Sequence, residues 1–477
     1  MKEACNMWDL VIKNGYVVSD RETILADIAV KNGLIKETGK ISSYEAKRTI
    51  DASGKYVLPG VIEAHMHCCA PFQGCIGAND FYEQSISAAF GGVTTMMDFC
   101  NTKQGDSVVE RFNARKKEME ISAIDYSVHG KFVSGSDVDE IQTLVDSGCP
   151  TFKVFTTYRQ EGVMSDDVTI MKVFEKAKEA GGLPMIHCES NGIAEFNDEK
   201  FREKEELTWE NFPKSKPIEC ETEAFARAIA FAKYIKCGLI VVHTTNGMCL
   251  DIARQAHKER IPVYVETGPH YLTLFDDLYK EKNGHLAICS PPLRTPKEAE
   301  ELWKGIQDGT ITLTGSDDCA YSYREKSMFL EKNNDGSFKQ NYKNVVNGIA
   351  GIEIRLPLLL GEGVAKGRLS IEQVCALTST NIAKVYGCYP RKGVIAPGSD
   401  ADFVIVDMNK EVTISKDILH NHVDYCLHEG FVEKGWPIVT ISNGNVIVEK
   451  GKFLGTKGAG RFIPRKIHNE IRESFNV

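Results

Sequence analysis

The sequence predicts an α/β protein, a (β/α)8 barrel of the TIM type with a small β-sandwich domain formed from both termini. The middle of the 477-residue chain alternates eight short β-branched runs with amphipathic helical patterns. Both ends of the chain are instead rich in strand patterns with Asn-Gly turns. The length suits a barrel that occupies most of the chain as one unit.

Residues 1–58 are expected to form the N-terminal part of the small β domain. The expected strands cover residues 10–12, 16–18, 28–30 and 34–35. Asn14-Gly15 and Asn32-Gly33 separate successive strands. Asn-Gly is the strongest short-range hairpin signal, because both central turn positions need a positive φ. We therefore expect a hairpin at each of these two dipeptides.

Residues 59–391 are expected to form the barrel. The expected strands cover residues 61–67, 92–99, 125–129, 151–155, 184–188, 239–243, 262–267 and 312–317. The expected helices cover residues 80–90, 109–120, 136–147, 168–180, 221–236, 248–259 and 297–308. The helix at 221–236 is typical, because its apolar residues fall on one face at helical spacing: Ala224, Phe225, Ala228, Ile229 and Ala232. Eight such units predict a barrel with its active site at the C-terminal ends of the strands.

Residues 392–455 are expected to complete the small β domain. Strand patterns at 401–406 and 438–441 run into Asn443-Gly444, which is followed by a further strand pattern at 446–448. Residues 456–477 form a tail rich in Gly, Lys and Arg, which we expect to wrap a neighbouring surface.

The composition, with 42% apolar and 26% charged residues, is that of an ordinary globular protein. A net charge of -9 without a basic stripe argues against nucleic-acid binding. There is no signal-peptide pattern and no apolar run near the roughly 18 residues that a membrane helix needs. The 15 cysteines include no Cys-x-x-Cys pair, which favours reduced thiols. We expect a cytoplasmic protein with neither nucleic-acid nor membrane partners.

Metal-ligating residue types recur at the ends of the expected barrel strands. They are His65, His67, His187, His243 and Asp317. His65 and His67 are two residues apart in a strand, so their side chains point to the same side. Neutral imidazole suits zinc, iron or nickel. The pattern therefore predicts a metal site at the barrel mouth.

Lys153 lies inside the expected strand 151–155 and has three interpretations. Its ammonium group could reach out to water from an apolar run. A buried lysine could instead become a neutral, reactive amine suited to Schiff-base chemistry. Beside four histidines, a neutral amine could also take up CO2 and form a carbamate able to bridge two cations.

Ten motifs spread over nearly the whole chain resemble the dihydropyrimidinase/hydantoinase family of the amidohydrolase superfamily, in a D-hydantoinase-like form. They include Pro59-Gly60, His65-x-His67, Gly91-Gly92-Val93-Thr94-Thr95, Phe152-Lys153-x-Phe155-x-x-Tyr158, His187-x-Glu189, Glu266-Thr267-x-Pro269, Ser290-Pro291-Pro292-Leu293-Arg294, Gly315-Ser316-Asp317 and Asn347-Gly348. The resemblance implies an enzyme that opens 5,6-dihydropyrimidine or 5-substituted hydantoin rings to N-carbamoyl amino acids.

The resemblance also implies a centre of two divalent metal ions per chain, with zinc as the expected metal. The implied ligands are His65, His67 and Asp317 for one ion and His187 and His243 for the other. Carboxylated Lys153 (N6-carboxylysine) would bridge the ions. Asp317 would also move the proton from the attacking water to the leaving nitrogen, and Tyr158 would donate a hydrogen bond to the oxyanion.

Ser290 and Asn347 are the implied substrate-binding residues, acting largely through backbone groups on a cyclic ureide or imide. The family also implies a homotetramer. Three residues depart from the family pattern: Glu63 replaces Asp, Asp318 replaces His and Lys216 replaces Arg. A second carboxylate beside Asp317 would disfavour an anionic substrate if it faced the ions, and it would have no effect if it pointed away.

Other readings remain beside this one. Dihydroorotase is discounted, because its substrate carboxylate is held by Arg two residues after His-x-His, where this chain has Cys69. Allantoinase, or another cyclic-ureide amidohydrolase, shares the chemistry and the ligand set. A non-catalytic dihydropyrimidinase-like scaffold is the reading from a different class, and the intact ligand set argues against it.

Overall fold

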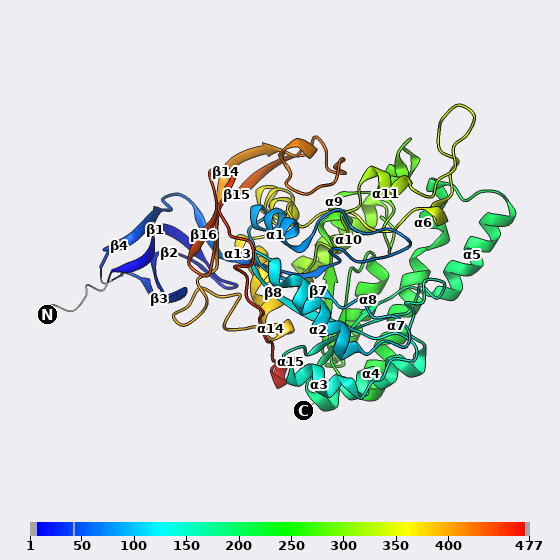
Figure 1. Cartoon of the computed structure of the whole chain (residues 1–477), viewed down its shortest axis with the longest axis horizontal. Helices are drawn as coiled ribbons and strands as arrows, with labels where there is room; N and C mark the ends of the chain where they lie inside the picture. Colours follow the sequence, from blue (N-terminus) through cyan, green and yellow to red (C-terminus); the bar gives the residue numbers. More distant parts are fainter. Residues whose placement is uncertain (1–6, 42, 473–477) are drawn as a thin grey trace.

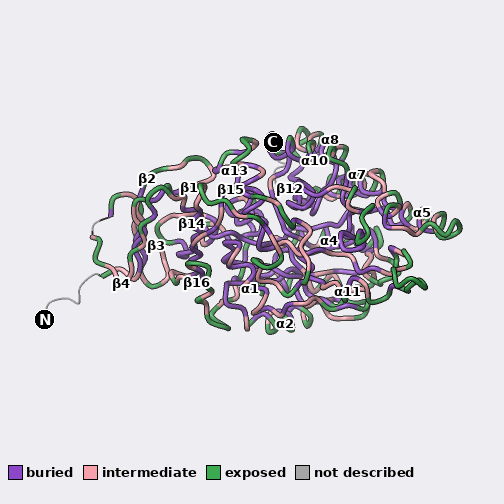
Figure 2. The backbone as a smooth tube through the Cα atoms, turned by 90° about the horizontal axis from the view of Figure 1, so that it is seen from above, coloured by how far each residue is buried: buried purple, intermediate pink, exposed green. Residues whose placement is uncertain are grey.

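The computed structural model describes residues 7–41 and 43–472. A barrel surrounded by helices forms the larger part of the molecule, and a sheet that contains the N-terminal strands lies at one side of it (Figure 1). Buried backbone concentrates along the centre of the molecule, whereas exposed residues lie on the outer helices and loops (Figure 2). The predicted fold class, with a barrel and a separate sheet from both termini, is confirmed.

Eight parallel strands form the barrel in the order in which they occur along the chain. They are β6 (Val61–Met66), β7 (Val93–Phe99), β8 (Asp125–Lys131), β9 (Thr151–Phe155), β10 (Leu183–His187), β11 (Leu239–Val241), β12 (Val263–Thr267) and β13 (Ile311–Thr314). The ends of the series meet where Met66 forms a parallel bridge with Asp318. The backbone N–H of His67 also donates to the Asp318 carbonyl at 2.8 Å. Strand ends from β6 and β13 therefore lie side by side.

The connections between barrel strands carry the expected helices. These are α1 (Phe81–Phe90), α2 (Val108–Glu118), α3 (Glu140–Asp146), α4 (Asp167–Ala180), α7 (Ile218–Ile235), α8 (Gly247–Lys258) and α10 (Pro296–Gln307). The predicted apolar stripe of α7 is buried along its length. Asp80 begins α1 with a capping box, in which its side chain accepts from the Glu83 N–H.

Further helices lie in the loops and in the C-terminal part of the chain. They are α5 (Asn191–Glu203), α6 (Phe212–Ser215), α9 (Pro269–Thr273), α11 (Tyr323–Ser327), α12 (Arg355–Leu358), α13 (Ile371–Cys375), α14 (Asn381–Tyr386) and α15 (Asn469–Arg472). Among the described residues, no helix is long and apolar enough to span a bilayer.

The small domain is one hydrogen-bonded sheet built from both ends of the chain. Its strands are β1 (Trp8–Val18), β2 (Thr23–Lys31), β3 (Leu34–Gly39), β4 (Ala46–Asp51), β5 (Tyr56–Pro59), β14 (Phe403–Thr413), β15 (Val432–Ser442), β16 (Asn445–Glu449) and β17 (Lys452–Phe453). Strand β5 joins the two halves, because it pairs in parallel with β1 and antiparallel with β14. Residues of both halves, such as Ile12 and Phe403, share one apolar core.

The predicted hairpin at Asn14-Gly15 is wrong. Strand β1 runs through this dipeptide and forms a bulge there. Asn14 has a φ of 60°, and a Cβ on Gly15 would lie 2.7 Å from Val57 Cγ2. Asn14 thus provides the left-handed backbone conformation of the bulge, and Gly15 leaves room for Val57 of the neighbouring strand. Asn32-Gly33 and Asn443-Gly444 do join antiparallel neighbours, β2 with β3 and β15 with β16.

The described part of the tail lies against the barrel. Ile463 donates its backbone N–H to the Tyr126 carbonyl at 2.7 Å. The buried guanidinium of Arg465 donates to the Val128 carbonyl at 2.6 Å and to Ser127 Oγ at 2.8 Å. These contacts fix the tail against β8, in line with the expectation that it wraps a neighbouring surface.

Candidate metal centre

The residues predicted to carry chemistry come together at the C-terminal ends of the barrel strands. One cavity is lined by His67, Lys153, Tyr158, His187, His243, Ser290, Asp317 and Asn347. His65 lies buried beside this cavity, with its Nε2 3.2 Å from Asp317 Oδ1. All nine predicted site residues are therefore brought together, although they are up to 282 positions apart (347 minus 65) in the chain.

Asp317 is the centre of one group of donors. Its Oδ1 lies 3.2 Å from His65 Nε2 and 3.3 Å from His67 Nε2. Donor atoms of His65, His243 and Asp317 all lie within 4.8 Å of one another. Burial raises the pKa of Asp317, but His65, His243 and His67 outweigh it and hold this pKa well below its usual value. The carboxylate is thus ionised and surrounded by imidazoles, as a cation ligand would be.

His187 and His243 form a second group of donors, with ring centroids 4.4 Å apart. His187 Nε2 lies 2.6 Å from Glu189 Oε2, so Nδ1 is the nitrogen that remains for a ligand. Burial lowers the pKa of both histidines, which favours the neutral imidazole that binds metals. The buried Nδ1 of His243 has no hydrogen-bond partner in the described part of the chain.

Lys153 lies between the two groups and is fully buried. Its Nζ is 3.4 Å from His65 Nε2 and 5.1 Å from the ring centroids of Phe99 and Phe155. Burial lowers the pKa of Lys153 to about 8, although Asp317 and Glu266 oppose this shift. The amine is therefore poised to lose its proton, which is the state that reacts with CO2. The site thus offers neutral imidazoles, one carboxylate and one reactive amine, a donor set that fits two divalent ions.

Two buried carboxylates that carry no sequence-based role hold these histidines in place. Glu266 Oε1, from β12, lies 2.6 Å from His65 Nδ1. Glu189, two residues after His187, contacts Nε2 of that ring and leaves Nδ1 for a ligand. A carboxylate on the second nitrogen of a metal-binding imidazole fixes its tautomer and orientation. The signal for them was present in the sequence, since both residues occur in the motifs that carry the resemblance.

The profile of the Amidohydrolase family matches residues 56–447. The chain belongs to this family. It is 34% identical to the D-hydantoinase of Ralstonia pickettii over 97% of this chain and 100% of that protein. It is also 34% identical to the D-phenylhydantoinase of Escherichia coli O1:K1, over 96% of this chain and 98% of that protein. The predicted resemblance is confirmed, and the chain is a hydrolase of this family.

Solved structures agree with the sequence relatives. The dihydropyrimidinase of Brevibacillus agri superposes with a TM-score of 0.91 at 32% identity, covering 96% of this chain and 98% of that chain. The L-hydantoinase (dihydropyrimidinase) of Arthrobacter aurescens superposes with a TM-score of 0.89 at 30% identity, covering 96% and 100%.

Three side chains depart from the family pattern, and each of them makes buried polar contacts. Glu63 accepts from the His65 N–H at 2.9 Å and pairs with Arg355 Nε at 3.1 Å. Asp318 points away from the histidines, because its Oδ2 accepts from the N–H groups of Gly351 and Ile352 at 2.7 and 3.0 Å. The second carboxylate after β13 therefore ties down a loop and does not face the cavity.

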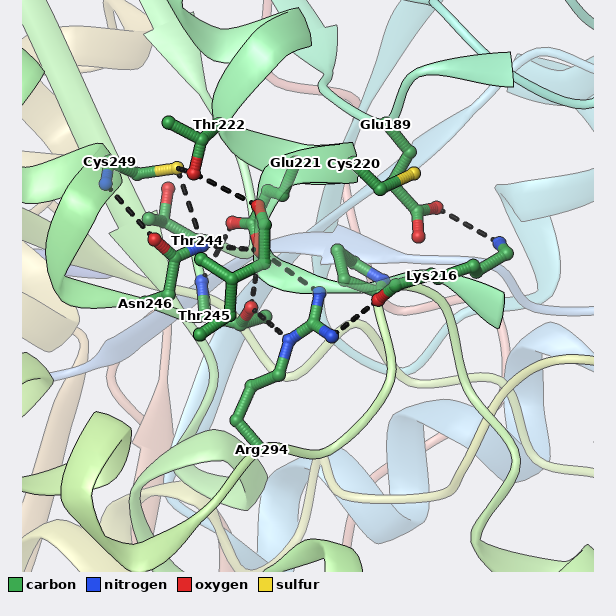
Figure 3. A network of polar contacts seen from close by, with 12 residues as sticks. Glu189, Lys216, Cys220, Glu221, Thr222, Thr244, Thr245, Asn246, Cys249 and Arg294 are labelled. Atoms are coloured by element: carbon green, nitrogen blue, oxygen red, sulfur yellow. Dashed lines mark hydrogen bonds and ion pairs between the residues drawn. The ribbon is translucent and has the colours of Figure 1, made fainter. Parts of the chain in front are cut away.

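The third departure, Lys216, lies in a buried polar network behind the cavity (Figure 3). Its Nζ is 3.2 Å from Glu189 Oε2 and also donates to Ser290 Oγ. Burial opposes ionisation of Glu189, but Lys216 and His187 hold the pKa of this carboxyl below its ordinary value. Lys216 thus keeps Glu189 anionic, and Glu189 in turn orients His187.

Arg294 extends this network to the loop after β11. It donates to the Lys216 carbonyl at 2.5 Å and to Thr245 Oγ1 at 3.1 Å. Glu221 accepts from the N–H of Thr245 at 2.9 Å and from Asn246 Nδ2 at 2.9 Å (Figure 3). Arg294 and Glu221 thereby hold the residues that follow His243. These contacts keep the imidazole of His243 in a defined position.

Tyr158 and Asn347 form the outer wall of the cavity. Asn347 Nδ2 donates to Tyr158 Oη at 3.2 Å, and the Asn347 N–H donates to Gln73 Oε1 at 2.9 Å. Burial raises the pKa of Tyr158 well above its usual value, so its hydroxyl remains a proton donor. Because Gln73 already accepts from the Asn347 N–H, the carbonyl and the side-chain amide are the groups of Asn347 left for a substrate.

Proposed function

We propose that this amidohydrolase opens cyclic ureides and imides, namely 5,6-dihydropyrimidines or 5-substituted hydantoins, to N-carbamoyl amino acids. One observation carries the proposal: four histidines, Asp317 and Lys153 converge on a cavity that also presents Tyr158. The relatives named D-hydantoinase and dihydropyrimidinase cover almost the whole chain, which supports the same reaction class.

The residues have separate tasks in this reaction. Two divalent ions held by the histidines and Asp317 would supply activation of water near neutral pH and polarisation of an amide carbonyl. Lys153, once its neutral amine has added CO2 and released a proton, would present two carbamate oxygens between the two donor groups. Asp317 would accept a proton from the attacking water and deliver it to the leaving ring nitrogen. Tyr158 would donate its hydroxyl proton in a hydrogen bond to the oxygen that becomes negative.

We further propose the metal, the oligomeric state and the cellular location of the enzyme. Zinc is the proposed metal, because imidazole and carboxylate donors at strand ends suit it. A homotetramer is proposed from the family resemblance, and a cytoplasmic location from the scattered cysteines, which favour reduced thiols. The reading as a non-catalytic scaffold is not favoured, because all six expected ligands are present and face one another.

The test compares ring opening of dihydrouracil, 5-phenylhydantoin and allantoin by one zinc-loaded preparation, with product formation followed by chromatography. We expect the N-carbamoyl product from at least one of the first two rings and loss of activity after chelation. Faster opening of allantoin than of both other rings would instead make the chain an allantoinase. No opening of any ring by protein that binds two ions would contradict the proposal.

A further inference from the structure

A lysine that the reaction does not use lies on the wall of the cavity. Lys131 is the last residue of β8 and pairs in register with Lys153 on β9. Register partners on neighbouring strands point to the same side of a sheet, so the side chain of Lys131, like that of Lys153, faces the barrel interior. Lys131 and its neighbour Asn101 both line the cavity of the metal centre.

Neither side chain has a protein partner within residues 7–41 and 43–472. Lys131 Nζ makes no ion pair or hydrogen bond there, and the side-chain amide of Asn101 makes no hydrogen bond. The nearby carboxylates are committed elsewhere: Asp98 pairs with Arg115 at 3.2 Å, and Asp106 pairs with Arg111 at 2.9 Å. Burial of the Lys131 ammonium without a counter-ion costs free energy, and an anion bound beside it would offset this cost.

The position of Lys131 relates it to the ring substituent of a substrate. In the eight-strand barrel, β8 and β12 are four strands apart, and Ser290 follows β12. Ser290 therefore lies across the cavity from Lys131, whereas Tyr158 follows β9, the strand next to β8. A ring whose amide groups were bound at Ser290 would direct the substituent on its carbon 5 toward Lys131 and Asn101.

We propose that the preferred substrate carries a carboxylate on this ring substituent, bound by the Lys131 ammonium and the Asn101 amide. This inference rests on the proposed function and names its substrate class. The ring is opened as before, and the carboxylate takes no part in bond making or breaking. Asp318 departs from the family pattern and would repel an anion if it faced the cavity. Its carboxylate instead accepts hydrogen bonds from the N–H groups of Gly351 and Ile352, so its charge points away from the cavity.

The experiment uses two substrates that differ only in charge, 5-(2-carboxyethyl)hydantoin and 5-(2-carbamoylethyl)hydantoin of the same configuration. With the zinc-loaded enzyme, we expect kcat/KM to be about tenfold or more higher for the carboxylate than for the amide. Lys131→Met keeps the length of the stem and removes the charge. It should lower the ratio of the two kcat/KM values to near one, mainly through KM of the carboxylate, and Lys131→Arg should restore most of the ratio.

Lys103→Met is the matched control, because it removes an exposed positive charge from the neighbouring loop without touching this cavity. It should leave the ratio unchanged. A wild-type ratio near one, or a ratio that survives Lys131→Met, would overturn the inference while ring opening itself upheld the proposed function. Opening of neither hydantoin by the metal-loaded enzyme would overturn the proposed function, and this inference with it.

Discussion

At the residue scale, the directions of two of the imidazoles, those of His65 and His187, are set by buried carboxylates that do not line the cavity. Glu266 takes one nitrogen of His65 at 2.6 Å, and Glu189 takes one nitrogen of His187 at 2.6 Å. Each ring then presents its other nitrogen to the site. The Lys216 ammonium at 3.2 Å keeps Glu189 charged for this task. Buried carboxylates therefore define the donor geometry that the proposed ions would use.

Asp317 is the residue expected to move the proton, and its neighbour provides a matched control. Asp317→Asn should lower kcat by about 10²–10⁴-fold, because an amide cannot accept the proton. Asp318→Asn should keep kcat within a few-fold, because Asp318 contacts the backbone of Gly351 and Ile352. Steady-state kinetics and metal analysis of both variants check this. Near-normal turnover of the Asp317 variant would remove it from the mechanism.

Lys153 is the residue expected to join the two donor groups. Lys153→Ala should reduce bound zinc from two ions per chain to one or fewer, measured by elemental analysis. Lys131→Ala should retain both ions, since Lys131 lies on the same wall but outside the predicted ligand set. Two ions and full activity in Lys153→Ala would refute the bridging role.

At the scale of elements, the site depends on how closely the ends of β6, β12 and β13 approach one another. Gly315 directly follows β13, and a Cβ there would lie 2.8 Å from His65 Cβ and 2.9 Å from the Glu266 carboxyl carbon. Arg355 reinforces the same junction, since it donates to the carbonyls of Thr314 and Ile62 at 2.6 Å each. Only glycine fits at position 315, because β6 and β12 approach this position too closely to leave room for a side chain.

Gly315→Ala should weaken metal binding by about 10–100-fold, because the added methyl group displaces His65 and its partner Glu266. Competition with a chromogenic chelator measures this change. Gly192→Ala is the control, because Gly192 lies in α5 and a Cβ there meets no atom within 4 Å. Unchanged metal affinity in the Gly315 variant would contradict the role of this close approach.

At the scale of the whole molecule, a buried charged cluster joins the barrel, the small sheet and the tail. Lys392 Nζ lies 2.6 Å from Asp125 at the start of β8 and 3.0 Å from Asp400 before β14. Arg461 of the tail reaches the same two carboxylates at 2.9 Å each. Asp402 also binds Lys392. The ammonium occupies the position that a cation would take among these carboxylates, so the cluster is a structural link between the parts of the chain.

This link predicts a pH dependence of stability. Burial raises the pKa of Asp125, but Lys392 and Arg461 outweigh it and lower the pKa to about 2, against 3.8 in a model peptide. The ionised carboxylate therefore stabilises the folded state by about 2 kcal/mol above pH ~4, and this contribution is lost as the pH falls toward about 2.

Asp125→Asn lacks this titration, so urea midpoints of metal-free wild-type and variant protein should converge as the pH is lowered from about 4 to 2. Burial raises the pKa of Asp402, so the effect of Asp402 on stability changes with pH in the opposite direction to that of Asp125. The difference in stability between the wild-type and variant proteins therefore isolates the contribution of Asp125. A constant difference across that pH range would contradict the assignment.

Much of the fold could be predicted from local pattern. The strand expected at residues 151–155 is β9 with the same bounds, and the stripe of the helix at 221–236 is the buried face of α7. These elements are decided by short-range alternation of apolar and polar residues. Asn14-Gly15 was the exception, since a strand partner on each side of β1 turned a hairpin signal into a bulge.

The sequence by itself determined the alternation of strands and helices and the residue types at the strand ends, because periodicity and ligand chemistry are properties of short segments. Only the tertiary structure decided which way Asp318 points, which carboxylates orient the histidines, and that Lys131 faces the cavity without a partner. These properties depend on contacts between residues far apart in the chain, such as the 2.6 Å approach of His65 and Glu266. No local pattern encodes such distances, since they arise when the barrel closes.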